Sequence, residues 1–248
     1  MSKCVIIGGA DIKAYDRIRS FLSDDDFIIY CDSGLKHRRL LGKDPDLIVG
    51  DFDSCTDYHI QIRHRSDDQI KKFDLFNYLD AEPDHFMLEY ESAKTAPAIR
   101  ITPEKYDSDT MFGVRTGLER GFEEFLLAGV VGQRFDHSFA NISILLMLDS
   151  LDKKAKLIDD YSEMEIVSSK PAFVSDCYSC FSLLAVCGTA KEIAIENARY
   201  TFLPNREITS EHQYAISNEV LPGKTARITV GEGRLLLVKV FREENETK

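Results

Sequence analysis

Two aspartates, Asp51 and Asp53, lie two residues apart directly after the apolar run Leu47–Val49. Residues i and i+2 of an extended segment point to the same side, with Cα atoms roughly 6.5 Å apart, so both carboxylates can reach one Mg²⁺ ion or the phosphates that it carries. Gly50 removes a side chain where a ligand has to approach the backbone. The structural alternative is a solvated turn in which Ser54 caps the next helix.

Further acidic clusters also follow apolar, strand-like runs, directly or after one short loop. They are Asp32-Ser33-Gly34, Asp107-Ser108-Asp109 and Asp136-His137. Such clusters suit phosphoryl or pyrophosphoryl transfer, which requires metal ions that bridge phosphate oxygens, cationic donors and in-line positioning of the nucleophile. The candidate metal ligands are Asp51, Asp53 and Asp109.

Two basic residues are candidates to bind phosphate. Arg134 offers a planar fork of donors, and Lys105 offers a point charge. Gly129 and Gly132 allow a sharp turn before Arg134. Structural alternatives stay open for this region, with Arg134 as a surface ion pair and His137 as a helix cap.

The first 160 residues alternate short apolar runs with helical patterns. The predicted strands are Cys4–Ile7, Phe27–Cys31, Leu47–Val49, Ala98–Ile101, Phe125–Val131 and Ala155–Ile158, and the predicted helices are Ile12–Leu22, Leu35–Leu41, Thr110–Arg120 and His137–Leu148. This order predicts an α/β fold whose N-terminal part is a doubly wound, mostly parallel sheet covered by helices. Ligands bind beyond the carboxyl ends of the strands in such sheets, and all four acidic clusters fall at that edge.

The segment Tyr58–Pro97 breaks this pattern, because it is polar, rich in Asp and aromatic residues, and long for a simple connection. We interpret it as an insertion with some helix of its own. Its histidines, His59, His64 and His85, share no helical face, which favours surface histidines over metal ligands.

From about Glu163 the pattern changes to short alternating strands separated by turns such as Pro222-Gly223. The clearest strands are Phe181–Val186, Glu192–Ile195, Ala226–Val230 and Leu235–Val240. Closely spaced strands with turn residues predict a C-terminal all-β sandwich domain, with a barrel as the alternative. We therefore expect two domains, residues 1–160 with the insertion at about 58–97, and residues 163–248.

Composition limits the partners of the chain. With 42 acidic and 31 basic residues, the net charge of −11 repels nucleic acids and anionic membranes, although a nucleotide can bind together with a cation. No apolar run approaches the roughly 18–20 residues of a membrane span, and Cys4–Ile7 is too short for the core of a signal peptide. The sequence therefore predicts a cytoplasmic protein that binds neither nucleic acid nor membrane.

Other common chemistries lack their motifs. Gly8-Gly9 is only a glycine pair after the first strand, without the trailing Lys-Ser/Thr of a phosphate-binding loop. No nucleophile-elbow serine or zinc-protease helix occurs. The pair Cys177 and Cys180 has metal-ligand spacing, but no second pair or nearby histidine completes a zinc site, so buried or incidental thiols are the better interpretation.

The order of the motifs resembles that of the thiamine pyrophosphokinase family, whose members transfer pyrophosphate from ATP to the hydroxyethyl group of thiamine. The resemblance spans nearly the whole chain and rests on four blocks: Asp32-Ser33-Gly34 with Leu40 through Ser54, Pro103 through Asp109, Gly132 through Asn141, and Ser217-Asn218-Glu219. The second and fourth blocks are weak signals when taken alone, whereas the order of all four is specific.

The resemblance implies an N-terminal α/β nucleotide-binding domain, a C-terminal β-sandwich that binds thiamine, and a homodimer whose active sites lie between subunits. It also implies ATP as co-substrate and Mg²⁺ as cofactor. The implied catalytic residues are Asp51, Asp53 and Asp109, which would hold Mg²⁺, together with Arg134 and Asp136. The implied nucleotide or thiamine contacts are Asp32, Lys105, Ser108, His137, Asn141, Ser217 and Asn218.

The sequence departs from the family pattern at Tyr106, where an acidic residue is usual. Asp107 points the wrong way in simple register to replace that acid, whereas Ser108 keeps the hydroxyl of the usual threonine. Three functions are consistent with the residues: pyrophosphoryl transfer from ATP to thiamine, a metal-dependent nucleotide phosphohydrolase or other small-molecule kinase, and a non-catalytic nucleotide- or thiamine-binding protein. Retention of all five implied catalytic residues favours the first over the last.

Overall fold

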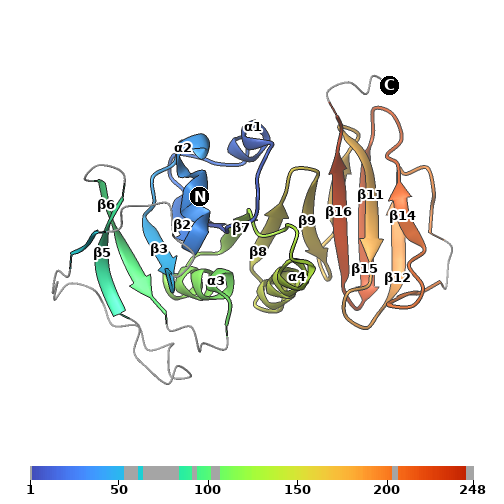
Figure 1. The fold of residues 1–248 in the computed structure, drawn as a ribbon. Helices are drawn as coiled ribbons and strands as arrows, with labels where there is room; N and C mark the ends of the chain where they lie inside the picture. Colours follow the sequence, from blue (N-terminus) through green and yellow to red (C-terminus); the bar gives the residue numbers. More distant parts are fainter. Residues whose placement is uncertain are drawn as a thin grey trace. The chain divides into compact units, whose positions relative to one another are not determined.

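The structure is a computed structural model that describes residues 2–52, 61–63, 84–90, 94–101, 107–202 and 206–243, with only the backbone described for 61–63. The chain divides into two compact units, Met1–Ile144 and Leu145–Lys248. Figure 1 shows the ribbon coloured along the sequence.

The first unit contains a sheet and several helices. Its strands are β1 (Cys4–Ile7), β2 (Phe27–Cys31), β3 (Leu47–Gly50), β4 (Gln61–Arg63), β5 (Asp84–Tyr90), β6 (Lys94–Arg100) and β7 (Glu124–Ala128). Its helices are α1 (Tyr15–Arg19), the 3-10 helix η1 (Asp32–His37), α2 (Arg38–Leu41), α3 (Asp109–Glu119) and the first part of α4 (Phe135–Ser150), which continues into the second unit.

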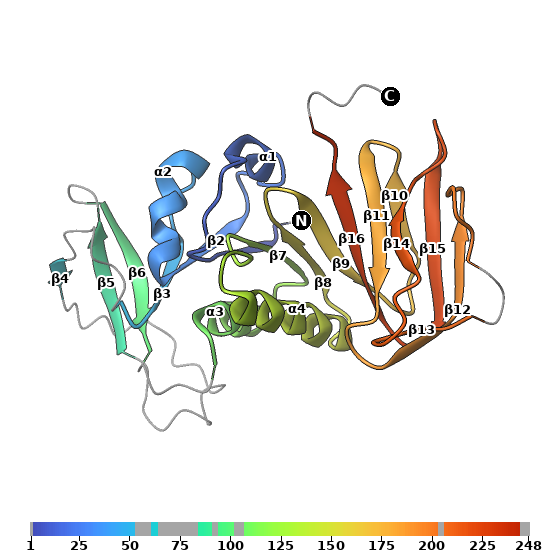
Figure 2. The same ribbon diagram turned by 45° about the vertical axis from the view of Figure 1, so that its right-hand side comes forward.

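The strands of the first unit follow the order β7-β1-β2-β3-β6-β5-β4, and the first five are parallel. β1 and β3 are buried at every residue, which explains their continuous apolar sequences, because both faces of a parallel sheet are covered. Figures 1 and 2 show α1 and α2 on one side of this sheet and α3 on the other. The prediction of a doubly wound, mostly parallel sheet is confirmed.

The segment 58–97 supplies strands at the edge of the sheet. β5 pairs antiparallel with both β6 and β4, and β6 extends the parallel set beyond β3. Buried Phe86, Leu88 and Tyr90 alternate with more exposed residues along β5, which is the period-two pattern of a strand covered on one face. The helix that we expected in this insertion is absent from its described residues.

The second unit consists mainly of antiparallel strands. They are β8 (Lys154–Ile158), β9 (Ser162–Val167), β10 (Ala172–Ser175), β11 (Tyr178–Leu184), β12 (Thr189–Glu196), β13 (Ile208–Thr209), β14 (Ala215–Asn218), β15 (Thr225–Glu232) and β16 (Leu235–Phe241). One sheet has the order β14-β11-β16-β9-β8 and the other the order β10-β15-β12-β13.

A single apolar core fills the space between the two sheets of the second unit. Val167, Phe181 and Leu237 contribute from the first sheet, and Val174 and Ile228 contribute from the second. Inward-facing residues from two antiparallel sheets define a β-sandwich, so the predicted C-terminal sandwich is confirmed. The domain boundary that the sequence places between residues 160 and 163 stays a prediction.

The cysteines of the described residues are present as thiols. The five described cysteines form no disulfide, and burial raises the pKa of the Cys4 thiol to about 12, so this thiol behaves as an apolar side chain. Cys55 lies outside the described residues.

No helix in the described part of the chain has the length and hydropathy needed to cross a membrane.

One carboxylate of the first unit is buried at an unfavourable position. Both side-chain oxygens of Glu119, the last residue of α3, are buried without a hydrogen-bond partner among the described residues. Burial raises the pKa of this carboxyl, and the charge of Arg120 opposes the shift only in part. The folded state therefore holds the Glu119 proton more tightly than the unfolded chain does, so the stability is highest below the unfolded pKa and falls as pH rises from the unfolded pKa through the higher folded pKa.

We expect Glu119→Gln to stabilise the protein at pH 8 by up to about 1 kcal/mol, because the neutral amide costs less to bury than the carboxylate. The gain should shrink towards pH 4, where the carboxyl is mostly protonated in both states. Thermal unfolding at the two pH values measures it, and the same change at exposed Glu211 is the control. A variant that is less stable than the wild type at pH 8 would show that the carboxylate has a stabilising partner.

Candidate functional site

A cleft of about 540 Å³ lies at the carboxyl ends of the parallel strands in the first unit. Its walls come from the loops after β1, β2, β3 and β7 and from the beginnings of α3 and α4. β1 lies between β2 and β7, so the chain winds away from β1 in opposite directions on its two sides. This is the switch point at which doubly wound sheets bind ligands.

Most of the site residues that the sequence indicates line this cleft. They are Asp32, Asp51, Ser108, Asp109, Arg134, His137 and Asn141. Asp53 and Lys105 lie outside the described residues, as does Tyr106. Asp136 does not line the cleft, but it accepts a hydrogen bond from Arg134, and Arg134 does line the cleft. Ser217 and Asn218 belong to β14, in the second unit.

Asp32 and Asp51 share the cleft because the ends of β2 and β3 approach closely. A Cβ atom on Gly50 would lie 3.0 Å from the Cβ of Asp32, a separation that a larger residue could not keep. Asp32 is 8% exposed and has a φ of 45°, in the left-handed region, where Asp is tolerated better than most residues. Gly50 therefore allows the contact that brings two of the four acidic clusters together.

Asp109 enters the cleft from the first residue of α3. Ser108 caps this helix, since its hydroxyl accepts a hydrogen bond from the backbone N–H of Met111 at 3.2 Å. The carboxylate of Asp109 thus stands at the positive end of the helix dipole, which stabilises negative charge. Asp107 instead pairs with Arg115 at 2.8 Å and does not line the cleft, so it does not replace the acid that Tyr106 displaces.

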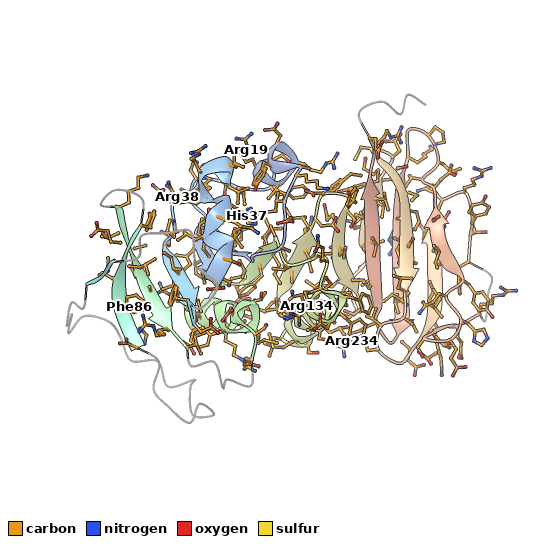
Figure 3. The ribbon with its side chains drawn as sticks, viewed as in Figure 1. Arg19, His37, Arg38, Phe86, Arg134 and Arg234 are labelled. Carbon is orange, nitrogen blue, oxygen red and sulfur yellow. The ribbon has the colours of Figure 1, made fainter. Side chains whose placement is uncertain are left out.

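Arg134 and Asp136 form a two-bond pair at the mouth of the cleft. The Nε of Arg134 donates to one oxygen of Asp136 at 2.9 Å, and Nη2 donates to the other at 2.6 Å. The guanidinium lowers the pKa of Asp136 well below its usual range, so the carboxylate stays ionised. A guanidinium has five N–H groups, so two bonds to Asp136 leave three for a ligand. Figure 3 labels Arg134 at the beginning of α4.

The loop that carries Arg134 is fixed by two polar residues of α4. The Ser138 hydroxyl accepts a hydrogen bond from the N–H of Gly132 at 3.1 Å and donates to the carbonyl of Arg134 at 3.0 Å. The buried amide of Asn141 donates to the carbonyl of Val130 at 2.7 Å. Sequence reasoning missed Ser138, although a hydroxyl in the first turn of a predicted helix is a recognisable signal. The nucleotide contact expected of Asn141 stays a prediction.

The loop after β1 is a second part of the cleft that sequence reasoning underrated. Gly8, Gly9, Ala10 and Asp11 all line the cleft. His37 lies beneath this loop, with its Nε2 2.9 Å from the carbonyl of Ala10, which can only accept, so Nε2 carries a proton. The glycine pair immediately after the first strand was the available signal.

In the second unit, Asn218 uses its side chain to fix local backbone. Its amide nitrogen donates to the carbonyl of Tyr200 at 2.7 Å, and its oxygen accepts from the N–H of Tyr200 at 3.0 Å and from that of Glu219 at 2.9 Å. Asn218 is 3% exposed. Its neighbour Ser217 is exposed, with a φ of 55°. The expected role of both residues in thiamine binding stays a prediction.

The donors in the cleft suit Mg²⁺ chemically, because Asp32, Asp51 and Asp109 offer the hard carboxylate oxygens that this ion prefers. No three His, Cys, Asp or Glu side chains of the described residues lie close enough together to hold a metal without further ligands. Magnesium usually retains several waters and binds through one or two carboxylates plus substrate phosphates, so a complete protein cage is not required.

The fold is shared with solved structures of low sequence identity. A thiamine pyrophosphokinase from Bacillus subtilis has a TM-score of 0.72 at 17% identity, covering 98% of this chain and 100% of that one. One from Geobacillus thermodenitrificans has a TM-score of 0.69 at 22% identity, covering 97% and 98%. One from Candida albicans has a TM-score of 0.66 at 15% identity, covering 97% and 89%.

A comparison of sequences is more specific. No curated protein sequence matches the chain. The sequence model of the family described as thiamin pyrophosphokinase, catalytic domain, matches residues 18–158, which is more than half of the chain and includes the loops of β2, β3 and β7 that line the cleft. The chain therefore belongs to the thiamine pyrophosphokinase family of enzymes.

Proposed function

We propose that this enzyme transfers a pyrophosphoryl group from ATP to thiamine, giving thiamine diphosphate and AMP. In this reaction the hydroxyl oxygen of thiamine bonds to the β-phosphorus of ATP, the bond from that phosphorus to the α-phosphate oxygen breaks, and the hydroxyl proton is released. The observation that carries the proposal is the cleft, which combines three acidic side chains with Arg134 at the switch point of the sheet, in a chain of this family.

In the proposed reaction Asp51 and Asp109 hold Mg²⁺, together with Asp53. The metal would neutralise the negative charge that builds up on phosphate oxygens during the transfer. Asp32 lies against Gly50 and completes the negative wall of the cleft. The helix dipole of α3 stabilises the carboxylate of Asp109 in its ionised form, which is the form that binds a cation.

Arg134 is proposed to bind the polyphosphate of ATP. Asp136 accepts hydrogen bonds from Nε and Nη2 of the guanidinium and thereby fixes its orientation. The remaining N–H groups can then donate to phosphate oxygens without a change of rotamer. Ser138 and Asn141 hold the backbone of the same loop. Asp136 is in this view a positioning residue, because it acts through Arg134.

Two further parts of the proposal rest on the family resemblance rather than on any described contact. One is a homodimer, and the other is the binding of thiamine by the C-terminal sandwich with Ser217 and Asn218. A cytoplasmic location stays a prediction.

The test is incubation of the purified protein with ATP, Mg²⁺ and thiamine, followed by separation of the nucleotides. The proposal expects AMP and thiamine diphosphate in equal amounts, and AMP only when thiamine is present. ADP or phosphate formed without thiamine would instead identify a phosphohydrolase or a different kinase. Absence of any turnover would favour a non-catalytic binding protein.

Replacement of Asp51 by asparagine should lower kcat by on the order of 10²-fold or more, since a neutral amide leaves the cation poorly coordinated and the triphosphate misplaced. Asp107→Asn is the matched control, because Asp107 pairs with Arg115 outside the cleft lining. Circular dichroism should show both variants folded. Near wild-type turnover of Asp51→Asn at saturating Mg²⁺ would remove Asp51 from the metal site.

The Arg134→Lys variant should also lose most of the activity, because an ammonium lacks the planar set of donors by which a guanidinium can bond to Asp136 and to phosphate at the same time. The exposed pair of Arg227 with Glu196 provides the control, and Arg227→Lys should change stability by no more than about 0.5 kcal/mol without a kinetic effect. Steady-state kinetics with ATP and thiamine varied in turn measures both variants. Equal kcat/KM values for Arg134→Lys and the wild type would make Arg134 a surface ion pair only.

A further inference from the structure

The turn that carries Asp51 has an unusual backbone. Phe52 follows Asp51 directly and has a φ of 62°, in the left-handed region that bulky side chains rarely adopt. The expectation of an extended segment across Asp51 and Phe52 is therefore wrong at Phe52, because β3 already ends at Gly50. The left-handed conformation persists only where the surrounding structure fixes it. The contacts of the Phe52 side chain are therefore part of what keeps the turn in this shape.

The ring of Phe52 rests on Phe86, a residue of β5 in the 58–97 insertion. The two ring centroids are 5.6 Å apart and the ring planes meet at 73°, which is the favourable edge-to-face arrangement. Phe86 is 1% exposed, so its own ring is fixed by packing. The guanidinium of Arg100 lies over the Phe86 ring, 5.2 Å from its centroid, and adds a cation–π contact. Figure 3 labels Phe86 on the strands at the edge of the sheet.

The hairpin of β5 and β6 is also bonded to the backbone before Asp51. β6 pairs in parallel with β3 and aligns Arg100 with Gly50, and the N–H of Ile101 donates to the carbonyl of Gly50 at 3.0 Å. The backbone on one side of Asp51 and the ring on its other side are thus both held by one hairpin. Asp51 stands between these two attachments.

We propose that Phe86 is a positioning residue, which acts through Phe52 to hold the carboxylate of Asp51 towards the cleft. Phe86 does not line the cleft, whereas Asp51 does, so the effect of Phe86 on a ligand is indirect, and the ring contact with Phe52 is the link that we propose. The inference rests on the proposed function, because it takes Asp51 as a ligand of the Mg²⁺ that accompanies ATP. It assigns a role in the site to an insertion that otherwise only extends the sheet.

The test measures binding of α,β-methylene-ATP, in which the bond that the proposed reaction breaks is replaced by an uncleavable one. Calorimetry gives its dissociation constant with Mg²⁺ and again with EDTA, and the ratio of the two reports the contribution of the metal. Phe86→Leu keeps an apolar side chain but loses the ring contact. It should reduce the Mg²⁺-dependent gain in affinity about tenfold and leave the affinity in EDTA unchanged, whereas a general loss of structure would weaken both.

Leu88→Val is the matched control. Leu88 is also 1% exposed and lies on the same face of β5, two residues further along, with no ring to contact Phe52. Its ratio should equal that of the wild type. Phe52→Leu removes the other half of the contact, and the double variant Phe52→Leu/Phe86→Leu should bind no more weakly than the weaker single variant, because both changes break one interaction. If Phe86→Leu fails to fold, Phe52→Leu carries the test alone.

The outcomes separate this inference from the function on which it rests. A Phe86→Leu or Phe52→Leu protein whose Mg²⁺-dependent gain matches that of the wild type overturns the inference and leaves the proposed function standing. A wild-type protein that binds the analogue no better with Mg²⁺ than with EDTA, and that forms no AMP from ATP and thiamine, overturns the proposed function and this inference together.

Discussion

The parallel pairing of β1 with β2 on one side and with β7 on the other is the constraint on which the candidate site depends. The loops after β1 and β7 diverge at this point, and the space between them becomes the cleft. Two backbone hydrogen bonds, from Gly8 to Ala128 at 2.9 Å and from Ala10 to Gly129 at 2.8 Å, fix the positions from which the loops diverge. Asp32, Asp51 and Asp109 then line one cleft because the strands and helix that carry them end or begin at this edge.

Much of this arrangement was predictable because buried parallel strands have continuous apolar sequences. Cys4–Ile7 and Phe27–Cys31 are strands with the predicted bounds, and acidic residues that directly follow such runs, as Asp32 and Asp51 do, lie at the ligand-binding edge. The predicted strand 125–131 ends earlier, at Ala128, because Gly129 adopts a φ of 63° and turns the chain. The alternation of Phe86, Leu88 and Tyr90 in β5 was also legible, but the polar composition around it obscured the signal.

Other features depend on contacts between residues that are far apart in the sequence, so no local pattern reports them. The amide of Asn218 is committed to Tyr200, eighteen residues earlier, and its oxygen also accepts from Glu219. The two hydrogen bonds between Arg134 and Asp136 join residues that are only two apart in the sequence. Whether this ion pair merely lies on the surface or orients Arg134 for a ligand depends on the cleft beside it. An Asp-x-Asp motif likewise says nothing about what holds the residue between the two acids.

The energies involved explain why the turn at Phe52 needs a partner. A bulky residue in a sparsely populated backbone region costs about 1–3 kcal/mol. An edge-to-face ring pair contributes about 0.5–1.5 kcal/mol. This contribution offsets a substantial part of the cost, so the ring contact helps to hold the turn. We expect that a turn without this contact would return Phe52 to negative φ more readily, which would rotate the peptide that Phe52 shares with Asp51.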